Sequence, residues 1–174
     1  GAAIVDADLF IVDDGAGGTN RKTAASRIKT YVGGGITVAD QWRLTTSFTG
    51  DAAPIASNWE VADTSGWGGI GSAMTESSGV FTFSSTGIWK VELVMSFTVT
   101  DSNSRYCTAS IYGTTDNSSY AEWGDARTHI YDSDAATYAN TYTSFLVDVT
   151  NTTNVKVRFH STVEDDNTAT RGNT

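Results

Sequence analysis

The sequence predicts a mainly β protein, an antiparallel β-sandwich or jelly roll preceded by a short strand-plus-helix N-terminal element. The first observation is the alternation of WKVELVMSFTV, residues 89–99, in which every second residue is apolar. The second is a series of shorter alternating segments separated by long loops. The third is Gly33-Gly34-Gly35, which separates residues with another pattern from these strands. We therefore expect an element at 1–35, which includes a glycine linker, and a β domain at 36–174.

The N-terminal element is predicted to be one strand followed by one short helix. IVDADLFIVDDGAGG indicates a strand that runs into a turn, and TNRKTAASRIKTY indicates a helix capped by Thr19 or Asn20. Its apolar residues, among them Phe10, Ile28 and Tyr31, are too few to form a core of their own. We expect them to pack against other copies of the same chain.

The segment DDGAGGTNRKT has some likeness to a phosphate-binding loop, which reads G-x-x-x-x-G-K-[ST]. The residue before Lys22 is Arg21, however, and the position of the first glycine holds Ala16. A second strand–helix–strand unit is also lacking downstream. The pattern therefore argues against nucleotide binding.

The β domain is predicted from 89–99 and its neighbours. Trp89 and the alternate apolar residues after it form one face, and Val94 is the apolar exception on the other. Further strands are expected in QWRLTTSF, GVFTFSSTG, YCTASIY, SFLVDV and VKVRFH, whereas EDDNTATRGNT at the end is expected to be a loop.

The composition of the chain limits the classes of partner that we expect it to bind. The formal net charge is −9 and the pI about 4.4, so a nucleic-acid partner is not expected. No apolar stretch is long enough to predict membrane insertion. Cys107 is the single cysteine, so the fold is expected to be held by packing and not by an internal disulfide.

Two resemblances add to this reading. The segment DADLFIVDDGAGGTNRKTAASRIKTYVGG, residues 6–34, resembles an element of tail-fibre and other virion proteins of tailed phages. That resemblance implies a virion location and contacts with other virion proteins through the N-terminal side.

The β domain carries the second resemblance in GVFTFSSTGIWKVELVMSF and NVKVRFHS. Residues 39–174 are similar to the trimeric jelly roll of the complement-head and tumour-necrosis-factor type, which implies a homotrimer with residues 1–35 as a connecting or trimerisation element. Members of that family end in an apolar last strand, and we expect the 36–174 domain to lack it and the chain to continue beyond Thr174.

Aromatic residues in polar loops are the candidates for contact with a host-surface glycan or protein, because an exposed ring can stack on a sugar. The alternative is that these rings close the ends of the sandwich. The candidates for receptor binding are Trp67, Tyr120, Trp123, Tyr131 and Tyr138.

Assembly is assigned to apolar and basic residues of the N-terminal element. The basic side chains could pair with Asp6, Asp8, Asp13 and Asp14 of neighbouring copies, or form a solvated helix face. The assembly candidates are Phe10, Arg21, Lys22, Arg27, Ile28 and Tyr31.

No catalytic set is recognisable. His129 and His160 are isolated in the sequence, and neither a nucleophile elbow nor a zinc spacing is present. The acidic runs at 13–14, 132–134 and 164–166 are explained by solvated loops, with calcium as the alternative. We expect no enzyme activity, metal or cofactor.

The expected function is a homotrimeric tail-fibre or head-fibre protein of a phage virion that attaches to the host surface. The alternatives are a capsid or tail component that binds only virion partners, and a monomeric carbohydrate-binding module.

Overall fold

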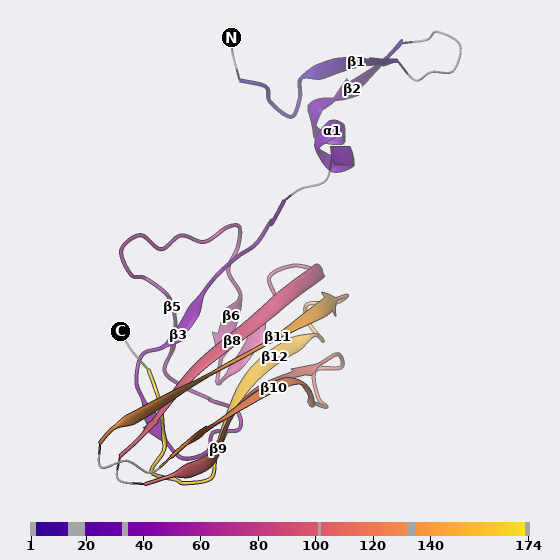
Figure 1. Cartoon of the computed structure of the whole chain (residues 1–174). Coiled ribbons are helices and arrows are strands. Elements are labelled where there is room, and N and C mark those ends of the chain that lie inside the picture. Colours follow the sequence, from indigo (N-terminus) through magenta and orange to yellow (C-terminus); the bar gives the residue numbers. More distant parts are fainter. Residues whose placement is uncertain (1–2, 14–19, 33–34, 101, 132–134, 173–174) are drawn as a thin grey trace. The chain divides into compact units, whose positions relative to one another are not determined.

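The computed structural model describes residues 3–13, 20–32, 35–100, 102–131 and 135–172. The chain forms two compact units, Gly1–Thr37 and Val38–Thr174 (Figure 1). The boundary lies two residues after the one that the triple glycine predicted.

The N-terminal unit is a β-hairpin followed by a helix. Strand β1 (Leu9–Asp13) pairs antiparallel with β2 (Asn20–Ala24), and α1 (Ala25–Val32) follows β2 directly. The sequence placed residues 20–24 in the helix, with Thr19 or Asn20 as its cap. Asn20 instead lies in β2, and Thr19 is outside the described residues.

The helix was predicted too long because β1 supplies a better partner for residues 20–24. The apolar β1 segment LFIVD can form a ladder of backbone hydrogen bonds with β2. Lys22 consequently lies in a strand, where a phosphate-binding loop needs the start of a helix. The helix α1 has only eight residues, a length at which an isolated helix is marginal in water.

The second unit is an antiparallel β-sandwich, as predicted. Its strands pair in a five-stranded sheet, a four-stranded sheet and a separate two-stranded pair (Figure 1). The five-stranded sheet has the order β10 (Ala121–Ile130), β9 (Ser104–Thr114), β12 (Lys156–Val163), β7 (Val80–Thr82) and β6 (Thr75–Ser77). The four-stranded sheet has the order β11 (Thr137–Val149), β8 (Gly87–Val99), β13 (Ala169–Thr170) and β4 (Phe48–Thr49), and the separate pair is β3 (Trp42–Leu44) with β5 (Trp59–Val61).

The final segment corrects a prediction, because EDDNTATRGNT is not only a loop. The two-residue strand β13 lies between β8 and β4, near the middle of the four-stranded sheet. Thr168 and Thr170 are fully buried there, and the hydroxyl of Thr170 is 2.7 Å from that of Ser161. The sequence hid this strand because its buried residue Thr170 is polar, and the partner of its hydroxyl, Ser161, lies on the separate strand β12.

The core lies between the two large sheets. In β8 the inward face carries Val91, Leu93, Met95, Phe97 and Val99, all buried, as the alternation predicted. Their partners come mainly from β9, β11 and β12. Each fully buried side chain of this size stabilises the fold by about 1.5–3 kcal/mol.

Aromatic rings form one end of this core. Phe81 of β7 contacts Trp42, Trp59 and Phe159, with ring centroids 5.1–5.3 Å apart. The indole nitrogen of Trp59 donates a hydrogen bond to the carbonyl of Ile55 at 2.8 Å. These contacts attach the β3–β5 pair to the sandwich.

Candidate binding surfaces

Three of the five predicted receptor-binding residues lie on the surface. Trp67 is in the loop between β5 and β6, Tyr131 follows β10, and Tyr138 begins β11. The ring of Tyr131 is 77% exposed and contacts His129 edge-on at 4.8 Å. The guanidinium of Arg171 lies 5.3 Å from the centre of the Tyr138 ring.

Tyr120 is half-buried, and another side chain already covers one face of its ring. The guanidinium of Arg158 lies over its ring at 3.8 Å from the ring centre. One face of this tyrosine is therefore covered by a cation from β12, which leaves less of the ring for a sugar.

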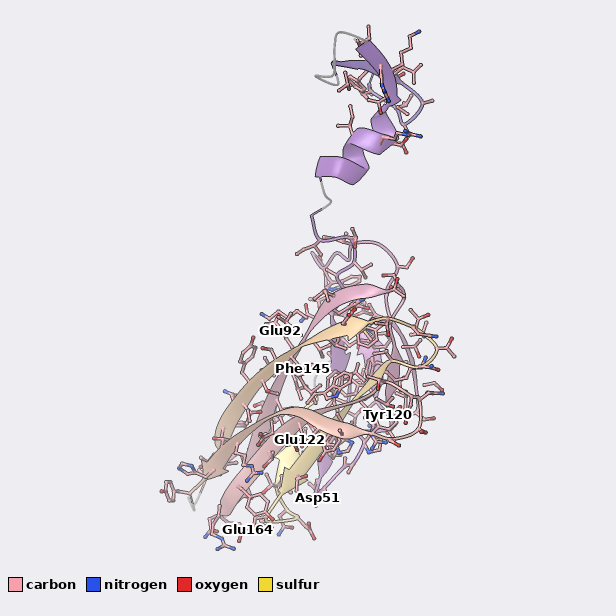
Figure 2. The ribbon with its side chains drawn as sticks, turned by 90° about the vertical axis from the view of Figure 1, so that its right-hand side faces the viewer. Asp51, Glu92, Tyr120, Glu122, Phe145 and Glu164 are labelled. Atoms are coloured by element: carbon pink, nitrogen blue, oxygen red, sulfur yellow. The ribbon has the colours of Figure 1, made fainter. Side chains whose placement is uncertain are left out.

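Trp123 is a partly buried strand residue that packs against the core, which corrects the prediction that it lies in an exposed loop. It is in β10, and its indole stacks with centroids 5.1 Å apart on Phe145 of β11, which is labelled in Figure 2. The ring also lies against Gly113 of β9. The polar neighbours in YAEWGDA suggested a loop because they include the outward-facing residues of this strand.

The predicted residues do not form one site. Tyr120 and Tyr131 flank the ten residues of β10, and eleven steps at about 3.3 Å per residue place them about 36 Å apart along the strand. Trp67 belongs to a third segment. At most Tyr131 and Tyr138 share one end of the sandwich, where β10 finishes and β11 begins.

A different surface feature was missed by the sequence analysis. The outer face of the five-stranded sheet has a hollow of about 260 Å³ over β9, β10 and β12. It is lined by the four alternate residues of β9 from Tyr106 to Tyr112, by Glu122 and Arg127 of β10, and by His160 and Thr162 of β12. Figure 2 shows Glu122 on β10, beside this part of the sheet.

The strand register explains how these residues meet. Tyr112 of β9 lies opposite Glu122 on one side, and Ser110 lies opposite His160 on the other. In the sequence only the polar alternation of YCTASIY pointed to this face. The pairing of β9 with β12, about fifty residues later, carries no local signal.

Two rings in the hollow are stacked on each other, and the pKa values of both are shifted. The imidazole of His160 stacks on the ring of Tyr112, with centroids 4.0 Å apart and planes 11° from parallel. Burial, and to a smaller extent the charge of Arg158, lower the pKa of His160 to about 4. Burial and the neighbouring carboxylate of Glu122 raise the pKa of Tyr112. At neutral pH the imidazole is therefore uncharged.

The charges around the hollow balance. Arg127 forms an ion pair with Asp125 of the same strand at 3.2 Å. Glu122 and Arg158 add one charge of each sign. The surface thus offers both hydrogen-bond donors and acceptors without a net charge of its own.

The acidic runs have local partners where the structure describes them. Asp165 accepts hydrogen bonds from the Ser102 hydroxyl and the Asn167 backbone, and Glu164 pairs with Arg105. Asp14 and residues 132–134 lie outside the described residues. Among the described residues, no group of three His, Cys, Asp or Glu side chains could hold a metal ion.

The predicted assembly residues divide between the hairpin and the helix. Arg21 and Lys22 lie on β2, opposite Val12 and Ile11 of β1, and not on a helix face as expected. Phe10 is on β1, Arg27 and Ile28 are on α1, and Tyr31 is in the last turn of α1, where its side chain is not described.

Neither a family model nor any curated protein sequence matches this chain. In the part of the chain that the structure describes, no helix has the length and apolar character needed to cross a membrane.

Proposed function

We propose that this chain is a homotrimeric structural protein of a phage virion, a tail-fibre or head-fibre component that attaches to the host surface. The phage-type element at residues 6–34 and the similarity of residues 39–174 to trimeric jelly rolls support this proposal. The observation that carries it is an exposed apolar stripe on the four-stranded sheet.

The strand order supports a jelly roll. From β7 onwards, each connection except β9–β10 leads from one sheet to the other, and the last strand β13 inserts beside β8. Long-range crossing of this kind is what distinguishes a jelly roll from a simple meander. The central position of β13 matches the place of the last strand in the trimeric family.

The apolar stripe runs along the outer face of β8 and β11. Val94 lies directly opposite Tyr142, whereas Leu146 lies opposite Lys90 and diagonal to Ile88, whose own partner is Asp148. The side chains of Ile88, Val94, Tyr142 and Leu146 are 54–71% exposed. The hydroxyl of Tyr142 donates a hydrogen bond to Glu92 at 2.5 Å. The ion pair of Lys90 with Glu92 lies between the two apolar pairs on the same face of β8. Exposed apolar residues grouped in this way mark association surfaces.

A second copy of the chain is the occupant that we propose for this stripe. The N-terminal unit independently exposes Ile4, Leu9 and Ile11, each more than 60% accessible, although its eight-residue helix and short hairpin cannot bury them. Two separate units of one chain thus both leave apolar surface uncovered. Association of identical chains covers both at once, and a trimer also presents three attachment sites for avidity.

Light scattering on the full chain tests the proposal. We expect a mass three times the 18.5 kDa of one chain. Combined replacement of Val94 and Leu146 by Asp should lower this mass, because three copies would bring six charges into the interface. Ile70→Asp, at an exposed apolar residue of the β5–β6 loop, is the matched control and should remain trimeric.

A monomeric wild-type chain would overturn the fibre proposal and favour the monomeric carbohydrate-binding module. A trimer that survives the Val94 and Leu146 substitutions would show that this stripe is not the interface. Circular dichroism of each variant checks that the sandwich is folded.

A further inference from the structure

The hollow on the outer face of the five-stranded sheet has features of a ligand site that the proposed function does not use. It lies on the opposite side of the sandwich from the apolar stripe, because the inward faces of the two sheets form the core. A trimer built through the four-stranded sheet would leave it open. Its floor is formed by regular strands, which hold side chains more firmly than loops do.

One buried group in the hollow lacks a partner. His160 is 8% exposed, and its Nε2 has no hydrogen-bond partner among the described residues. The stacked ring of Tyr112 covers one face of the imidazole. This nitrogen has almost no accessible surface, so it adds polar character to the floor of the hollow but is not itself a contact for a ligand.

The lining selects the chemistry of the ligand. Thr108, Ser110 and Thr162 contribute hydroxyl groups, Glu122 accepts hydrogen bonds and Arg127 donates them. Hydroxyl groups flanked by one acidic and one basic side chain suit a ligand with several hydroxyl groups. The balanced charges described above give no preference for an anion or a cation.

The volume of the hollow and the aromatic ring at its margin narrow the class of ligand further. The volume of about 260 Å³ is below the usual range of about 300–1,000 Å³ for small-molecule sites, so one ring of a larger molecule fits better than a complete drug-sized ligand. Tyr106 is 42% exposed at the margin of the hollow, where its ring can pack on the apolar face of a sugar.

We propose that this hollow binds one neutral pyranose ring of a host-surface polysaccharide, with Tyr106 stacking on the ring and Arg127, which lies opposite Thr108 near the same end of β9, bonding its hydroxyl groups. The inference rests on the proposed role in host attachment, since three weak sites on one trimer would give avidity. It relocates attachment from the end loops, where the sequence placed it, to the face of the five-stranded sheet.

Saturation-transfer NMR of the full chain with neutral methyl glycosides tests the site. The probes are the methyl α- and β-glycosides of glucose, galactose, mannose and N-acetylglucosamine. We expect transfer to at least one of them in the millimolar range. Tyr106→Ala and Arg127→Gln should each weaken binding about tenfold or more, because each removes a contact of the ring or its hydroxyl groups.

Tyr131→Ala and Trp67→Ala are the matched controls, since both remove exposed aromatic rings outside the hollow. They should leave binding unchanged. Loss of transfer in these two variants, with binding retained in Tyr106→Ala and Arg127→Gln, would overturn the proposal in favour of the end loops. The absence of transfer to every probe would overturn it as well.

Light scattering on the same samples separates this proposal from the proposed function. A trimer without saccharide transfer would refute only the site. A monomer that binds a glycoside through Tyr106 and Arg127 would refute the fibre assembly but support the site. Thermal unfolding of each variant confirms that changes in binding do not arise from loss of the fold.

Discussion

Replacement of Gly113 by alanine is expected to destabilise the sandwich by acting on Trp123. Gly113 lies on the inward face of β9, and a Cβ atom there would come well within 3.0 Å of three ring atoms of Trp123, a separation that real Cβ atoms essentially never show. Phe145 stacks on the same indole with centroids 5.1 Å apart and limits how far the ring can move. The substitution therefore overpacks the edge of the core where β10 and β11 meet.

The cost follows from the usual penalty for overpacking, about 1–3 kcal/mol. Because the obstructing atoms belong to a large, stacked ring, we expect the upper part of this range, about 2–3 kcal/mol. A chain of this length loses about 2–4 °C in its unfolding midpoint per kcal/mol, so the midpoint should fall by about 4–12 °C.

Differential scanning calorimetry at one fixed protein concentration measures the effect, since association would otherwise shift the midpoint. Gly68→Ala is the control, because a Cβ atom at that loop position meets nothing within 4 Å. In a Trp123→Leu background, the added cost of Gly113→Ala should fall below about 1 kcal/mol, because the obstructing ring is gone. An unchanged midpoint in the single variant Gly113→Ala would refute the inward position of Trp123.

Three further predictions concern pH, a turn and assembly. The pKa of His160 is lowered from 6.5 to about 4 in the folded chain. The stability that comes from keeping this imidazole neutral is therefore complete above pH 6.5 and is lost as the pH falls toward 4. In urea unfolding, the free energy of unfolding should decrease by up to about 2 kcal/mol between about pH 6.5 and 5, and His160→Gln should abolish this decrease. Gly79→Ala should lower the unfolding midpoint by more than Gly68→Ala does, since Gly79 has φ +80° and a Cβ atom there would collide with the backbone of residue 55; equal midpoints would contradict this. Ile28→Asp should weaken the oligomer in light scattering more than Tyr138→Ala does, and the reverse order would remove α1 from the assembly surface.

The local sequence pattern was sufficient to predict which face of a long strand points toward the core. The alternation in residues 89–99 predicted which side chains of β8 face the core, and Val94, its apolar exception, lies on the exposed stripe. This succeeds because side-chain direction in a strand depends only on position along the chain. Glycine at 33–35 likewise predicted the division into two units to within two residues.

Local pattern failed where a partner strand decided the outcome. Residues 20–24 looked helical but pair with β1, and Ala169–Thr170 looked like a loop but fills a place between β8 and β4. Trp123 looked exposed because its neighbours are polar, yet its own side of β10 faces Gly113 and Phe145.

The sequence by itself determined the fold class, the two-unit division and the inward faces of the long strands, because these follow from periodicity and composition. Only the tertiary structure decided the candidate sites. The apolar stripe requires β8 beside β11, and the hollow requires β9 between β10 and β12. Such neighbours lie tens of residues apart in the chain, and their side chains meet only when non-local backbone pairing sets the register.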